Sequence, residues 1–191
     1  MTGRKTTWML VIFGCFALLF LAGLITADYV KAAQLAAAAL REAEEKVIPT
    51  RLIIPKIRVD AAIEPVGLTG EGAMSAPATP SGVGWLATHP KPGENGNAVM
   101  DGHRGWKNQI PAVFDHLYEL EAGDRIYVGD GADKLHVFVV RKKKAFLPGQ
   151  DAAEVFADVA GAHLNLITCD GDWDTSKKSY ARRLVVFADK E

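Results

Sequence analysis

A cysteine and a histidine, each at the end of an apolar segment, are the side chains of this sequence best suited to chemistry. Cys169 ends the segment 164–169 (LNLITC) and is followed at once by a polar DGD sequence. His103 follows the segment 97–102 (NAVMDG) and has a glycine on either side within two residues. A cysteine with a histidine partner can form a thiolate and imidazolium pair and act as a covalent nucleophile. The alternative for Cys169 is a buried structural thiol.

Two adjacent arginines are a third candidate group. Arg182 and Arg183 directly precede the apolar segment 184–188 (LVVFA). An arginine beside a thiolate favours the ionised nucleophile and offers N–H donors to a developing oxyanion. Successive side chains of a strand point to opposite faces, so at most one arginine should share a site with Cys169. The structural alternative for the pair is an ordinary solvated strand end.

The segments that must position these residues have the pattern of β-strands. Short β-branched runs bounded by Gly, Pro, Asn and Asp are typical of strands, and about eight follow residue 50. After residue 50, only segments 110–118 and 151–159 have a helical pattern, which favours mostly antiparallel or irregular connections. We therefore expect a mostly β domain, a closed or sandwich-like barrel with short helices. The predicted strands are 51–54, 58–63, 84–87, 97–102, 125–128, 135–142, 164–169 and 183–188.

The N-terminal part has a different character. Residues 8–27 are 20 consecutive residues without a charge. At about 1.5 Å per residue they would span roughly 30 Å, the thickness of one hydrocarbon core. The run predicts an uncleaved transmembrane anchor, with a cleaved secretory signal as the alternative. Because Arg4 and Lys5 precede it, the N-terminus should be cytoplasmic and everything after Asp28 outside.

These features divide the 191 residues into four parts. Residues 1–7 are a cytoplasmic N-terminus and 8–27 a transmembrane signal-anchor. Residues 28–50 form a stalk or linker that is rich in helix-favouring Ala, Glu, Lys and Leu. The folded domain occupies residues 51–191. Because one predicted span precedes this domain, we expect a single-pass membrane protein whose folded domain is extracytoplasmic.

Composition excludes several classes of function. The chain is 49% hydrophobic and 24% charged, with a formal net charge of -1. That balance argues against a disordered tail and against a basic nucleic-acid-binding protein. The two cysteines cannot make a disulfide scaffold, because Cys15 lies in the apolar run and Cys169 is alone in the exported part.

The chain resembles the sortases, membrane-anchored cysteine transpeptidases of bacterial cell surfaces. The similarity covers about 51–190 and rests on four segments in order, RLIIPKI at 51–57, VMDGHR at 99–104, LITC at 166–169 and RLVV at 183–186. The resemblance implies an eight-stranded sortase-like β-barrel preceded by a transmembrane helix in the bacterial cell membrane. A subclass similar to D, E or F is the expectation.

The resemblance also implies roles for the candidate residues. Cys169 would be the nucleophile, His103 the acid/base, and Arg183 the residue that steadies the oxyanion or positions the peptide, with Arg182 as the alternative. The segment 146–163 would supply the wall of a peptide groove. The family often has Thr in the first position of a TLxTC pattern, where this chain has Asn165. This departure bears on substrate preference more than on the chemistry.

The partners implied are the C-terminal sorting signals of exported proteins, LPxTG-like or LAxTG-like, and an acceptor amine of a cell-wall precursor or a pilin. A sortase-like peptidase that uses water as acceptor and a non-enzymatic binding module are the alternatives. No nucleotide cofactor is expected, because phosphate-loop and dinucleotide fingerprints are missing. No metal is expected, because the other histidines lack the spacing of metal ligands, and no nucleic acid, because the chain is nearly neutral. The alternating acids Asp170, Asp172 and Asp174 begin like a calcium loop, but Thr175 and Ala181 stand where such a loop needs Gly and Glu.

Overall fold

The computed structural model describes residues 29–41, 48–176 and 179–191, in two compact units that divide after Lys46. In the first unit residues 29–41 are helical and exposed, as the helix-favouring composition predicts. Among the described residues, no helix has the length and apolarity needed to cross a membrane. The predicted anchor at residues 8–27 lies outside the described residues.

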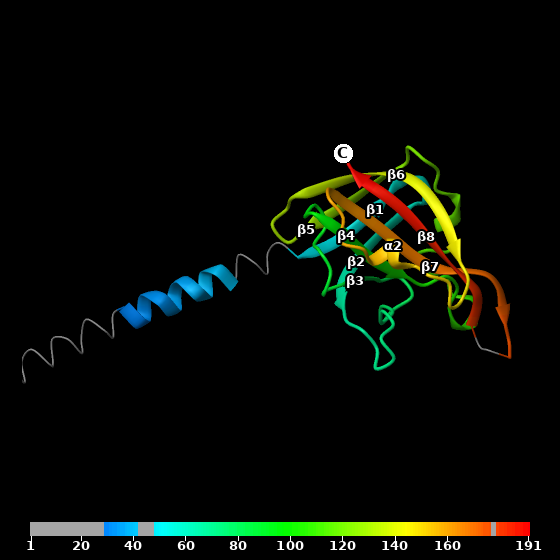
Figure 1. Cartoon of the computed structure of the whole chain (residues 1–191), viewed down its shortest axis with the longest axis horizontal. Coiled ribbons are helices and arrows are strands. Elements are labelled where there is room, and N and C mark those ends of the chain that lie inside the picture. The colour runs from blue at the N-terminus through cyan, green and yellow to red at the C-terminus, as the bar shows by residue number, and fades with distance from the viewer. Residues whose placement is uncertain (1–28, 42–47, 177–178) are drawn as a thin grey trace, which may run out of the picture. The chain divides into compact units, whose positions relative to one another are not determined.

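The described part of the second unit contains eight strands that close into a barrel (Figure 1). Their order around the barrel is β1-β2-β3-β4-β7-β8-β6-β5, and β5 pairs with β1 to complete it. The pairs β2/β3 and β4/β7 are parallel, and the others are antiparallel. The predicted barrel is therefore confirmed in its closed form. The strands are β1 Pro49–Ile54, β2 Val59–Val66, β3 Val83–Leu86, β4 Gly96–Gly102, β5 Arg125–Asp130, β6 Leu135–Phe146, β7 Ala162–Asp174 and β8 Ser179–Lys190.

Alternate residues of the strands fill the barrel interior. Met100 on β4, Leu164 and Leu166 on β7, and Phe138 on β6 are fully buried in one apolar cluster. Burial of each such side chain contributes about 1.5–3 kcal/mol. Since the pleat has a period of two, their neighbours in sequence point to the outside of the barrel.

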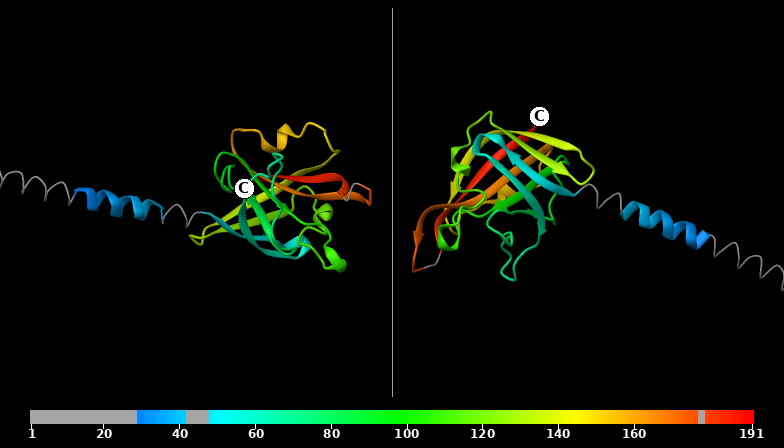
Figure 2. Two further views of the ribbon diagram at one scale, coloured as in Figure 1. Left: turned by 90° about the horizontal axis from the view of Figure 1, so that it is seen from below. Right: turned by 180° about the vertical axis from the view of Figure 1, so that it is seen from behind.

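A second apolar cluster lies on the outside of the barrel. Val99 and Val185 belong to it, together with Val155 of the short helix α2 (Ala153–Phe156). This helix is part of the connection between β6 and β7, which lies over one side of the barrel in Figure 2. The outer face of β4, β7 and β8 is thus covered in part by its own chain.

The predicted helix at 110–118 does not form. The N–H groups of Val113 and Phe114 donate instead to the carbonyls of Pro80 and His103, which lie outside the segment. Short 3₁₀ helices replace it, namely η2 Lys107–Gln109 and η3 Leu117–Glu119, and η1 Pro55–Ile57 lies earlier in the chain. The predicted helix at 151–159 shrinks to α2.

Candidate active site

Cys169 lies within β7 rather than at its end, because the strand continues to Asp174. The neighbouring Thr168 is buried inside the barrel and its hydroxyl donates to the carbonyl of Gly102 at 2.8 Å. Cys169 therefore points to the outer face. Just beyond it, the pairing with β8 becomes irregular between Asp170 and Trp173. The predicted end of the strand at Cys169 was wrong, because β7 continues to Asp174 in a long hairpin with β8.

His103 directly follows β4, and three contacts fix its position. Its Nε2 lies 2.8 Å from the carbonyl oxygen of Pro77, so this nitrogen is the donor. The ring packs against Trp106 with centroids 4.5 Å apart. The carbonyl of His103 accepts the N–H of Phe114 at 3.0 Å. In the neutral imidazole this arrangement leaves Nδ1 as the nitrogen without a proton.

The strand register brings the candidate residues together. β4 and β7 are parallel neighbours in which Asp101 pairs with Ile167, so His103, one residue past β4, comes level with Cys169. On the other side, β8 pairs Arg183 directly with Cys169. Adjacent strands lie about 4.8 Å apart. The register thus sets the cysteine between the histidine and the arginine on three neighbouring strands.

The two arginines differ in their partners. Arg182 donates to the carboxylate of Asp170 at 3.0 Å, and the other oxygen of that carboxylate accepts Arg104 at 3.0 Å. Arg183 has a weaker anchor, because its guanidinium donates to the carbonyl oxygen of Arg182 at 3.1 Å. Alternation along β8 places Arg183 on the outer face with Val185. Arg183 is therefore the arginine that shares a face with the thiol.

Charges around the thiol act in opposite directions. Burial raises the pKa of the Cys169 thiol, Arg183 and Arg104 lower it, and Asp101 raises it. Burial also raises the pKa of the Asp101 carboxyl to about 7, and the nearby Glu64 adds to that rise. Asp101 Oδ1 is buried and has no hydrogen-bond partner among the described residues. The carboxyl fits only because Gly84 lies opposite, where a Cβ would come within 2.6 Å of Oδ1.

The replacement Asp101→Asn should lower the pKa of Cys169, because it removes the negative charge that opposes the thiolate. The pH profile of Cys169 alkylation by iodoacetamide should shift to lower pH. Stability should change as well. The raised pKa means that the folded state binds the proton more tightly, so wild-type stability should fall as pH rises from 3.8 to about 7. The variant should lose that part of the slope in pH-dependent denaturation.

A matched control is Glu64→Gln, which removes a carboxylate that acts on Asp101. This change favours the ionised form of Asp101, so the alkylation profile should not move to lower pH. An unchanged profile in Asp101→Asn, or the same shift in both variants, would disprove the role of Asp101. Sequence reasoning missed this residue; the available signal was an acid two positions before the histidine in an apolar strand.

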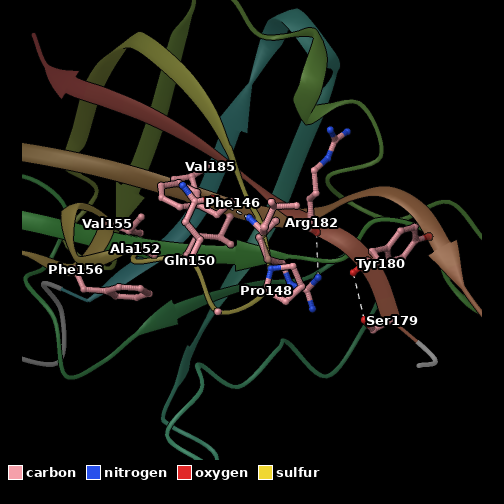
Figure 3. A pocket seen from close by; sticks show the side chains of 14 residues that line it. Phe146, Pro148, Gln150, Ala152, Val155, Phe156, Ser179, Tyr180, Arg182 and Val185 are labelled. Carbon is pink, nitrogen blue, oxygen red and sulfur yellow. Dashed lines mark hydrogen bonds between the residues drawn. The ribbon is translucent and has the colours of Figure 1, made fainter. Parts of the chain in front are cut away.

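A pocket of about 350 Å³ opens beside the strands β7 and β8 that carry Cys169 and Arg183. Its lining includes Ile167 and Arg183, which lie next to Cys169 on the same face. Figure 3 shows Ala152, Val155 and Phe156 on one side and Ser179 and Tyr180 on the other. The residues between Phe146 and Phe156 that line it belong to the segment expected to form a groove wall.

The described residues offer no obvious metal site. Among them, no three His, Cys, Asp or Glu side chains are grouped so that they could hold an ion. The carboxylate of Asp170 is engaged by Arg104 and Arg182, and Asp174 accepts hydrogen bonds from the backbone and side chain of Ser176. These acids serve the structure of the β7/β8 hairpin.

The fold and site together define a β-barrel protein with a partly buried thiol beside an apolar groove. The chain belongs to the sortase family, since the family model for the sortase domain matches residues 52–191. It is therefore a cysteine transpeptidase, which rules out the non-enzymatic alternative. No curated protein sequence matches the chain.

Solved sortase structures share the fold. A lid mutant of sortase A from Corynebacterium diphtheriae superposes with a TM-score of 0.60 at 25% identity, covering 75% of this chain and 70% of that one. Sortase C-1 from Actinomyces oris gives a TM-score of 0.58 at 22% identity, covering 76% and 74%. The second similarity supports the fold alone. A subclass similar to D, E or F stays a prediction.

Proposed function

We propose that the protein cleaves the C-terminal sorting signal of exported proteins, of the LPxTG or LAxTG kind, and transfers them to an amine of a cell-wall precursor or a pilin. Cys169 is the nucleophile, His103 the acid and base, and Arg183 the oxyanion or peptide-positioning residue. The observation that carries this proposal is the strand register, which sets Cys169 between His103 and Arg183 beside the pocket. The N-terminal segment anchors the enzyme in the membrane with this domain outside.

Acylation comes first in the proposed mechanism. The Cys169 thiolate attacks the carbonyl carbon of the signal's Thr, and a C–S bond forms as the oxyanion develops. The Arg183 guanidinium lies on the same face and offers N–H donors to that oxygen. When the C–N bond breaks, His103 gives its proton to the leaving amine. A thioester and a free C-terminal fragment result.

Transfer reverses these roles. An acceptor amine attacks the thioester carbon, and His103 accepts its proton as the new C–N bond forms. The C–S bond then breaks and the Cys169 thiolate is restored. The thioester conserves the free energy of the cleaved amide bond, so the cycle needs no nucleotide. Water in place of the amine would make the enzyme a peptidase.

The direct test is incubation of the full-length chain in detergent with LPxTG-type and LAxTG-type peptides and a panel of amines. Mass spectrometry should show an acyl group on Cys169 and a product that contains the amine. Absence of any acyl-enzyme with either peptide type would refute the proposed substrate class. Product formed equally well without amine would favour the peptidase alternative.

The replacement Arg183→Ala should reduce kcat/KM by about 10²-fold to 10³-fold, the usual loss when an oxyanion donor is removed. Arg182→Ala is the matched control because the residues are adjacent and Arg182 is bound to Asp170. It should retain activity within about tenfold, as expected for a partly exposed ion pair. Peptide cleavage assays compare the two. An inactive Arg182→Ala with an active Arg183→Ala would reverse the assignment.

A further inference from the structure

Two buried asparagines of the barrel hold the backbone of the connection that forms one side of the pocket. Asn97 on β4 is 4% exposed and Asn165 on β7 is 1% exposed. The amide nitrogen of Asn97 donates to the carbonyls of Ala157 at 2.9 Å and Glu154 at 3.3 Å. The amide nitrogen of Asn165 donates to the carbonyl of Val155 at 2.7 Å. Two strands thus bind the short helix α2 through side-chain hydrogen bonds.

These hydrogen bonds supply what so short a helix cannot. The last four carbonyls of any α-helix have no partner within the helix, and α2 has only four residues. Val155 is 1% exposed, so its carbonyl has little access to water. The asparagine amides therefore replace both water and a longer helix as donors to α2.

The hydrogen bonds of Asn165 indicate that this residue serves to position the backbone of Val155 rather than to stabilise the fold. Its Oδ1 is buried without a hydrogen-bond partner among the described residues. The reverse amide orientation would set this oxygen against the carbonyl of Val155, two acceptors facing each other. The unpaired oxygen carries a desolvation cost, which offsets part of the stability that the hydrogen bond to Val155 contributes. The benefit of an asparagine here lies in where it holds Val155.

The same strand face carries the nucleophile. Asn165, Ile167 and Cys169 are alternate residues of β7 and share its outer face. Ile167 and Val155 both line the pocket and belong to one apolar cluster. On β4, Val99 pairs with Asn165 and Asn97 lies two residues before it on the same face. The wall is thus fixed to the strands that present the thiol and the histidine.

A second attachment is more exposed. The carboxylate of Glu154 lies between Lys142, at 2.8 Å, and Lys144, and all three side chains are 38–43% exposed. Exposed ion pairs hold a segment weakly and are screened by salt. The buried hydrogen bonds from the two asparagine side chains are therefore the stronger constraint on α2.

We propose that Asn97 and Asn165 are positioning residues that fix the groove wall relative to Cys169 and so determine how tightly the sorting peptide binds. This inference rests on the proposed function. It also gives a physical meaning to Asn165, which stands where the family pattern often has Thr. The backbone carbonyls that accept these hydrogen bonds belong to the groove wall. Loss of either asparagine side-chain amide should therefore loosen the wall and leave the position of the Cys169 thiol unchanged.

The test uses Asn165→Leu and Asn97→Leu, which keep the branched shape of the side chain and remove the donor. In the full-length enzyme each should raise KM for the cleaved LPxTG-type or LAxTG-type peptide about fivefold, the change expected for about one net hydrogen bond. We expect kcat and the rate of Cys169 alkylation by iodoacetamide to change less than twofold. Hydrogen exchange should rise at residues 152–157 and stay unchanged in the barrel strands.

The control is Glu154→Gln, which breaks the ion pairs with Lys142 and Lys144 and leaves the hydrogen bonds from the asparagine side chains to the backbone carbonyls. It should leave KM within about twofold of wild type. Unchanged KM and exchange in both asparagine variants, or the full effect in Glu154→Gln, would overturn the inference. If Asn165→Leu does not fold, Asn165→Val removes the same donor with a smaller, β-branched residue that has no polar atom. Wild-type enzyme inactive on every peptide would reject the proposed function, whereas the exchange data would still test the wall.

Discussion

Replacement of Cys169 by alanine should abolish peptide cleavage and the acyl-enzyme together. Removing a covalent nucleophile commonly costs about 10⁴-fold or more in kcat, since the remaining groups only bind and polarise the substrate. The side chain is half-buried on the outer face of β7 and is the register partner of Arg183. Its removal leaves the barrel interior untouched, so the thermal midpoint should stay close to that of wild type. Mass spectrometry of the peptide-treated enzyme and a cleavage assay provide the measurements.

The chain contains its own matched control. Cys15→Ala removes the other cysteine of the sequence, which lies in the apolar N-terminal run. That variant should keep full activity and still form the acyl-enzyme on Cys169. Turnover retained in Cys169→Ala, or an acyl group found on Cys15, would contradict the assignment of the nucleophile.

The barrel could be predicted because its interior follows a simple rule. Alternating apolar residues such as Met100, Leu164 and Leu166 mark the strands, and each of these residues is fully buried. The extension of β7 beyond Cys169 was missed because residues 170–174 (DGDWD) are polar and aromatic without alternation. Only pairing with β8 makes them a strand, and such pairing depends on the partner segment. The same applies to 110–118, where the N–H groups of Val113 and Phe114 donate to distant carbonyls.

The sequence pointed to the side chains of the candidate site but not to the backbone contacts that hold them in position. Cys169, His103 and Arg183 stand out because reactive residue types follow or precede apolar segments. The carbonyl of Pro77 that fixes His103 comes from a loop 26 residues away in sequence, and backbone atoms leave no signal in residue type. Asn165 was visible as a departure from a pattern. Its hydrogen bond to Val155 depends on how the connection folds over the barrel, which no local pattern encodes.

Replacement of His103 by alanine should reduce kcat/KM for an amide substrate by about 10²-fold to 10⁴-fold, the range of general acid–base catalysis. The imidazole is held between the carbonyl of Pro77 and the ring of Trp106 at the level of Cys169. A histidine so placed can protonate the leaving amine, which is a poor leaving group without a proton. Steady-state cleavage of the peptide measures the loss.

The decisive comparison uses a peptide whose scissile amide is replaced by an ester. An alkoxide is a better leaving group than an amide anion, so the ester depends less on proton donation. His103→Ala should therefore lose much less activity in acylation by the ester than by the amide, measured as the burst of acyl-enzyme. His116→Ala is the control, because that exposed histidine pairs only with Glu119 and Tyr118 among the described residues; it should leave both substrates unaffected. An equal loss on amide and ester would show that His103 acts on the thiol rather than on the leaving group, and no loss on either would remove it from the mechanism.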